Sequence, residues 1–138
     1  MQKNKTPQRE KVLSFEKKPI AKTGRECLLL CNQIAASMSK IYKYQLGADI
    51  CRAGTQLAGA IYLALDNMGY SEQKISDIKK INEKLIELLV LVRVARDTNQ
   101  VAAPNFELLI SKIVSIKTQA ENWLGFIEKG TDKANEDK

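Results

Sequence analysis

Apolar residues recur every three or four positions along four stretches of the chain, and charged or amide residues fill the positions between them. This spacing places the apolar side chains on one face of a helix. The joins between the stretches fall at residues 43–45, near Gly69 and at 98–103, and Pro104 suits the first turn of the fourth helix. The pattern therefore predicts four helices.

The apolar seams of these helices follow a heptad-like spacing, which is typical of helices that pack about 20° apart. The first seam consists of Cys27, Cys31, Ile34, Met38 and Ile41, and the last of Phe106, Leu109, Ile113, Ile116, Ala120, Trp123 and Ile127. Four amphipathic helices with short joins predict an all-α fold, specifically an antiparallel up-down four-helix bundle.

Outside the seams the chain ends are polar. Thr23, with Glu26 three residues later, is a plausible helix start, so we expect the bundle to cover residues 24–128. Residues 1–23 hold seven basic and two acidic residues together with Pro7 and Pro19. They predict a basic, flexible N-terminal arm. Residues 129–138 predict a disordered tail.

The third helix changes character along its length. Up to Glu87 its outer face is charged, for example at Lys74, whereas residues 88–92 are apolar on every side. A helix that is apolar all round is covered all round. Either this helix is unusually central in the bundle, or its extra face meets another protomer or a different protein. In the second case the interface residues are Leu88, Val90, Leu91 and Val94.

Several kinds of chemistry are missing from the sequence. There is no histidine among the 138 residues and no glycine-rich phosphate loop, so a nonenzymatic protein without metal or cofactor is expected. The three cysteines are interpreted as free thiols, with Cys27 and Cys31 one helical turn apart in the core. No apolar run reaches about 18 residues and no secretory signal opens the chain, which predicts a cytoplasmic protein without membrane contact.

Basic residues gather around the first join, where tyrosines lie between them. Lys40, Lys43 and Arg52 could neutralise phosphates, and Tyr42 and Tyr44 could stack on unpaired bases. Alternatively, the tyrosines lie at the edge of the core and the lysines merely solvate a helix end.

Further basic residues extend the candidate nucleic-acid site. Arg93 and Arg96 could hold a phosphate or an acidic partner, or could pair with Asp97 or Asp49 inside the assembly. In the arm, Lys17 and Lys18 are candidate electrostatic contacts to nucleic acid, although basic tails are common.

Three short segments resemble a bacterial and phage superfamily of four-helix bundles. Residues 40–47 (KIYKYQLG) resemble its Pro-Lys-x-x-(Arg/Lys)-Tyr-x-Leu-Gly join, with Ser39 in place of the proline. Residues 91–97 (LVRVARD) are similar to its Leu-x-Arg-x-Ala-x-Asp segment, and residues 122–125 (NWLG) to its terminal Gly-Gly-Trp region. The resemblance covers about residues 24–127. Members include accessory variability determinant (Avd) proteins of diversity-generating retroelements and proteins encoded in intervening sequences of ribosomal RNA genes.

The Avd resemblance implies a specific role. Such a protein forms a homopentamer, binds a reverse transcriptase with its structured template RNA, and supports mutagenic cDNA synthesis without catalytic residues of its own. Whether the cDNA is also bound stays open. Two alternatives remain: a stand-alone RNA-binding bundle of the intervening-sequence type, and a scaffold that binds protein only.

Overall fold

Helices account for all the regular secondary structure in the described part of the chain. The computed structural model describes residues 11–67 and 72–136, with side chains described as far as Gly130. The elements are the 3-10 helix η1 (Ser14–Lys17), α1 (Pro19–Ser37), α2 (Lys40–Tyr42), the π-helix η2 (Lys43–Gly47), α3 (Ala48–Asp66), α4 (Glu72–Asp97) and α5 (Ala103–Glu136). The all-α prediction is confirmed.

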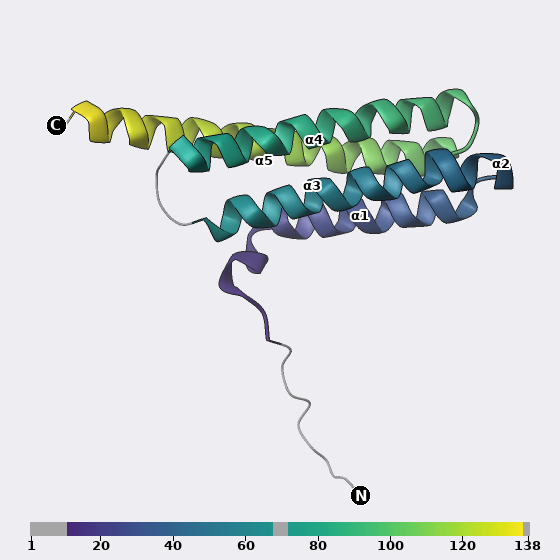
Figure 1. The fold of residues 1–138 in the computed structure, drawn as a ribbon, viewed down its shortest axis with the longest axis horizontal. Helices are drawn as coiled ribbons and strands as arrows, with labels where there is room; N and C mark the ends of the chain where they lie inside the picture. Colours follow the sequence, from purple (N-terminus) through teal and green to yellow (C-terminus); the bar gives the residue numbers. More distant parts are fainter. Residues whose placement is uncertain (1–10, 68–71, 137–138) are drawn as a thin grey trace, which may run out of the picture.

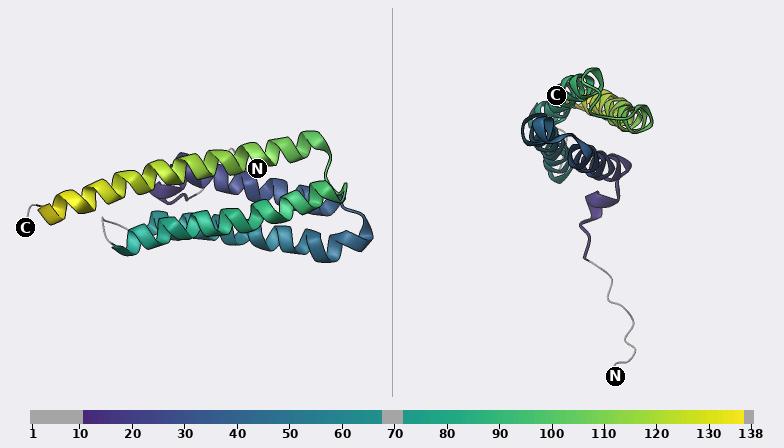
Figure 2. Two further views of the ribbon diagram at one scale, coloured as in Figure 1. Left: turned by 90° about the horizontal axis from the view of Figure 1, so that it is seen from above. Right: turned by 90° about the vertical axis from the view of Figure 1, so that its right-hand side faces the viewer.

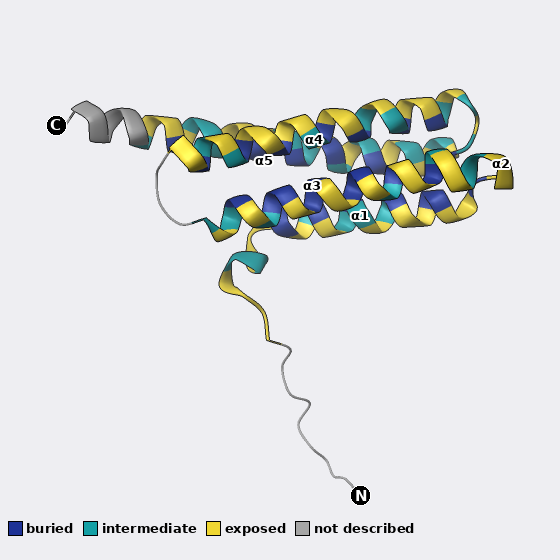
Figure 3. Ribbon diagram, in the orientation of Figure 1, coloured by how far each residue is buried: buried dark blue, intermediate teal, exposed yellow. Residues whose placement is uncertain are grey.

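The four long helices lie side by side, as the views along and across their axes show (Figures 1 and 2). Helix α1 packs against α3 and α5, and α4 packs against the same two helices. Each long helix therefore has two neighbours, and their inward faces enclose one apolar core (Figure 3). The predicted four-helix bundle is present. None of the described helices combines the length and the apolarity needed to cross a membrane.

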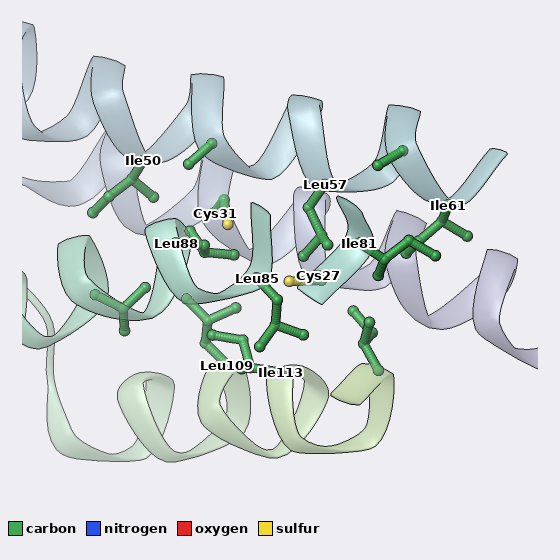
Figure 4. Packing of buried hydrophobic residues seen from close by; sticks show 14 of the residues in the cluster. Cys27, Cys31, Ile50, Leu57, Ile61, Ile81, Leu85, Leu88, Leu109 and Ile113 are labelled. Carbon is green, nitrogen blue, oxygen red and sulfur yellow. The ribbon is translucent and has the colours of Figure 1, made fainter. Parts of the chain in front are cut away.

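The predicted seams supply most of the core. Figure 4 shows Cys27 and Cys31 packed among Leu57, Leu85 and Leu88, and all five side chains are at most 1% exposed. In α5 the predicted seam is buried throughout, except that Phe106 and Trp123 are half-buried. Both cysteines were correctly interpreted as core residues.

The first seam ends at Met38, one seam position before the predicted end at Ile41, because α1 breaks before the join. Met38 and Ser39 both adopt extended backbone conformations, with ψ of 152° and 153°. This break interrupts the helical phase, so Ile41 is 80% exposed instead of buried. The prediction that Ile41 lies in the core was wrong.

The helix ends also differ from the prediction. Helix α1 begins at Pro19, four residues before the expected start, and the Thr23 hydroxyl donates to the Pro19 carbonyl oxygen within its first turn. The residues just before α1 contact the bundle, since the Phe15 ring meets Tyr62 edge-on at 5.6 Å between centroids. Helix α5 continues past Gly130 to Glu136. The first ten residues of the expected arm and the last two of the expected tail lie outside the described residues.

Two glycines of α3 provide a matched test of how closely α1 and α3 pack. A Cβ on Gly54 would lie 3.1 Å from the Cys31 sulfur and 3.2 Å from the Leu28 Cδ1, whereas a Cβ on Gly59 would meet nothing within 4 Å. We expect Gly54→Val to lower the free energy of unfolding by about 2 kcal/mol through overpacking. Gly59→Val should change it by less than about 0.5 kcal/mol. Urea unfolding of both variants measures the difference, and equal stabilities would contradict the close approach of α1 and α3.

Candidate nucleic-acid interface

The connection between α1 and α3 is built from two short helices. After the break at Met38 and Ser39, α2 provides one turn and the π-helix η2 leads directly into α3. Gly47 at the end of η2 allows a close approach to α1, because a Cβ there would lie 3.3 Å from the Ala35 Cβ. π-Helical turns occur frequently at functional sites. The predicted nucleic-acid residues 40–44 lie on this irregular segment.

The turn between α4 and α5 is hydrogen-bonded to this connection. The Gln100 Oε1 accepts hydrogen bonds from the Ser39 backbone N–H at 2.9 Å and from its hydroxyl at 3.0 Å. The Gln100 Nε2 donates to the Thr98 carbonyl oxygen, and Asn99 takes the left-handed backbone conformation (φ 59°) that asparagine tolerates. Both connections therefore lie at the same end of the bundle, which we call the join end (Figure 1).

Side chains of the predicted site differ in how accessible they are. Lys40 is exposed and Tyr44 is 72% exposed, whereas Lys43 and Tyr42 are half-buried. Arg52 is exposed but forms an ion pair with Asp49 at 2.6 Å, one turn earlier on α3. Tyr42 packs against the core, as the alternative interpretation expected, and Tyr44 does not. Lys40 and Tyr44 are thus the side chains best placed to meet a ligand, and the half-buried Lys43 lies between them in the sequence.

The two arginines of α4 also point to the join end, with different contacts. The Arg93 guanidinium lies 5.3 Å from the centroid of the Phe106 ring, and the Arg93 side chain is exposed. The Arg96 Nη1 donates to the Val101 carbonyl oxygen at 3.0 Å, so Arg96 stabilises the turn between α4 and α5. The partner of Arg96 is a backbone carbonyl, whereas the structural interpretation expected an aspartate.

The charge of the join end is positive. Residues 36–55 and 90–106 hold the five basic residues named above and two acidic ones, Asp49 and Asp97. Ile41, which the sequence pattern assigned to the core, adds an exposed apolar side chain next to Lys40. The hydrophobic pattern could not predict the exposure of Ile41, because it depends on the break after α1 and no proline or glycine marks that break.

Lys17 and Lys18 are exposed, but the structure does not bring them to the join end. They precede α1, whose 19 residues span about 28 Å before Ser39 is reached. The predicted nucleic-acid residues therefore form two separate groups, one at each end of α1.

The predicted interface residues of α4 fall on different faces of the helix. Leu88 is 0% exposed and belongs to the core, so the prediction that it contacts a partner was wrong. Leu91 is half-buried, whereas Val90 is 58% and Val94 is 42% exposed. Steps of four add Ile86, which is 43% exposed, to the same face. We call Ile86, Val90 and Val94 the apolar stripe of α4.

Mutual contact and burial set the pKa values of the thiols. The hydrogen bond with Cys27, together with burial, raises the pKa of Cys31, and burial raises that of Cys51. Among the side chains of residues 11–67 and 72–130, no three or more histidine, cysteine, aspartate or glutamate side chains are grouped so that they could hold a metal ion. Cys27 and Cys31 are core side chains, whereas Cys51 is half-buried. No protein-family model matches this chain, and no curated protein matches it either.

Proposed function

We propose that this chain is a noncatalytic accessory protein of a diversity-generating retroelement. It binds structured template RNA at the join end and holds that RNA beside the reverse transcriptase in the cytoplasm, so that mutagenic cDNA synthesis can proceed. The polymerase supplies the bond-making chemistry. The resemblance of residues 40–47 and 91–97 to the superfamily that includes the Avd proteins supports the choice of system, and the join end supports the RNA-binding role.

The observation that carries the proposal is the pair of hydrogen bonds between Ser39 and Gln100, which links the two connections. It holds Lys40 and Lys43 at the same end as Arg93, and the exposed Tyr44 follows Lys43 in the sequence. Lysine and arginine release counterions from phosphates, and an exposed aromatic ring stacks on unpaired bases. Such a surface suits the loops and bulges of a folded RNA.

The proposal includes an up-and-down topology in which successive long helices alternate in direction. The contacts between α4 and α5 support it, because Arg93 meets Phe106 whereas Asn82, earlier on α4, accepts a hydrogen bond from Lys117, later on α5. This arrangement places the α1–α3 and α4–α5 connections together at the join end.

Self-association through the apolar stripe of α4 completes the proposal. Three exposed aliphatic side chains in line on one helix are a surface that a second copy can cover. The Avd resemblance implies five copies. Five chains of charge +6 carry about +30 in total, which would attract RNA over a long range.

The salt dependence of RNA binding tests the proposed function. Three phosphate contacts, from Lys40, Lys43 and Arg93, predict a slope of about −2 for log affinity against log salt on single-stranded RNA. Raising potassium chloride from about 0.1 to 0.3 M should therefore lower the affinity about tenfold. Fluorescence anisotropy with a labelled RNA hairpin that carries a large loop measures it.

Anisotropy at low salt, combined with co-purification of the chain with a candidate reverse transcriptase, separates the alternatives. Absence of RNA binding at low salt, together with salt-independent co-purification with a reverse transcriptase, would favour the protein-only scaffold. RNA binding without co-purification of the reverse transcriptase would favour the stand-alone RNA-binding bundle.

A further inference from the structure

Positive charge is concentrated on α1 and on the residues that flank it. Residues 17–40 hold five basic residues and one acidic residue, a net charge of +4, whereas the whole chain carries +6. Helix α4 is also rich in charged residues, but its six basic and five acidic residues leave a net charge of only +1. The side of the bundle that α1 forms therefore offers a polyanion an excess of basic groups.

The single acidic residue of this segment already has a basic partner. Glu26 forms an ion pair of 3.0 Å with Lys112, across the contact between α1 and α5. Its neighbour Arg25 donates to the Glu16 carbonyl oxygen and to the Tyr62 hydroxyl, and both of these acceptors are neutral. The contacts of this segment therefore leave its positive charge in excess.

The exposed positions of α1 form one continuous face. They follow one another in steps of three or four residues, so they lie in line along the helix (Figure 3). We call them the outer face of α1, and they are Lys22, Arg25, Leu29, Asn32 and Ala36. The outer face thus presents basic, amide and apolar side chains and carries no carboxylate.

The outer face connects the two groups of predicted nucleic-acid residues. Lys17 and Lys18 precede α1 at the η1 end, and Lys40 follows it at the join end (Figure 1). The 19 residues of the helix separate the two groups by about 28 Å. Because no carboxylate interrupts the outer face, a chain of phosphates can follow it from one basic group to the other without repulsion from a like charge.

We propose that a single-stranded segment of the bound RNA runs along the outer face of α1 and contacts both basic groups at once. This inference rests on the proposed RNA binding and adds to it a path and a minimum length. At about 3.4 Å per nucleotide, about eight nucleotides cover the length of the helix. A shorter unpaired segment reaches the join end alone.

The salt dependence of binding to an unstructured RNA of about 15 nucleotides tests the path. The three contacts of the join end together with Lys18 and Lys22 predict a slope of about −3.5 for log affinity against log salt. Lys18→Glu with Lys22→Glu should return the slope to about −2 and lower the affinity at least about 25-fold at 0.1 M salt. Lys79→Glu with Lys80→Glu, the same change on α4, should lower it less than about threefold. Equal losses in the two double variants, or an unchanged slope, would overturn the proposed path.

A single carboxylate placed halfway along the path tests it independently. Leu29 is 58% exposed on the outer face, and Leu29→Glu should weaken binding of the same RNA about threefold through repulsion of the phosphates. Leu63→Glu makes the same change at a 68% exposed position on α3 and should leave the affinity unchanged.

The failure of this inference and the failure of the proposed function give different results. If charge reversal at Lys40 and Lys43 weakens RNA binding but the Lys18, Lys22 and Leu29 variants bind like the wild type, the join end stands as the site and the path along α1 is wrong. If the wild-type chain binds no RNA at low salt, the proposed function fails and the path fails with it.

Discussion

Replacing Lys40 and Lys43 together with glutamate should lower the affinity for RNA by at least about 25-fold at 0.1 M salt. Each phosphate contact to single-stranded RNA contributes about 0.7 to the slope of log affinity against log salt, so two lost contacts give this factor. The reversed charges then add repulsion. Arg52 is left unchanged, because its ion pair with Asp49 already compensates its charge. Anisotropy of the labelled hairpin RNA measures the loss.

The control is a double variant with the same change in charge at positions outside the join end. Lys79 and Lys80 are exposed on α4, and Lys79→Glu with Lys80→Glu removes the same charge. We expect less than about a threefold loss of affinity from the general field alone. Equal losses in the two double variants would mean that RNA responds to net charge and that the join end is not a site. Because Lys43 is half-buried, thermal unfolding of both variants is compared with that of the wild type.

Periodicity predicted the core well wherever a helix is unbroken. The seam of α5 has the right phase from Leu109 to Ile127, and its spacing alone identifies the buried positions. The seam of α1 fails only at Ile41, after the extended residues Met38 and Ser39. A break without proline or glycine leaves no mark in the hydrophobic pattern, so residue spacing could not reveal it.

Lys74 illustrates the opposite error, in which the available signal was overlooked. Its charge placed it on the outer face of α4, yet it precedes Ile78 by four residues and continues the buried series Ile78, Ile81 and Leu85. The spacing therefore indicated burial. What it could not indicate is the compensation, since the carbonyl oxygens that accept from Lys74 belong to the end of α3. Burial lowers the pKa of Lys74, and Asp77 acts in the opposite direction.

Only part of the candidate site could be predicted, because contacts between distant segments leave no mark in the sequence. The cluster of Lys40, Lys43 and Tyr44 is local in sequence and could be identified from composition alone. The hydrogen bonds between Ser39 and Gln100 link residues 61 positions apart, and no pattern in either segment predicts them. Contacts of this kind, between distant parts of the chain, decide which basic residues are already engaged within the fold and which are available to a phosphate.

Replacing Val90 and Val94 with glutamate should convert the proposed oligomer into monomers at micromolar concentration. The two side chains are 58% and 42% exposed in the single chain, so the glutamates are solvated there and the fold should persist. In an oligomer that covers the stripe, two carboxylates without partners would be buried, at a cost of several kcal/mol. About 2.7 kcal/mol already raises a dissociation constant 100-fold. Sedimentation velocity at several protein concentrations measures the change.

Leu63→Glu provides the matched control, because Leu63 is 68% exposed on α3 and the substitution also introduces a carboxylate on an apolar surface. It should leave the oligomer intact, since α3 does not contribute to the stripe. Dissociation by Leu63→Glu but not by the double variant would assign the interface to α3 instead. A wild-type chain that sediments as a monomer at micromolar concentration would contradict self-association altogether. The apolar stripe would then remain for a different protein, and the join end would have to bind RNA with the charge of a single copy.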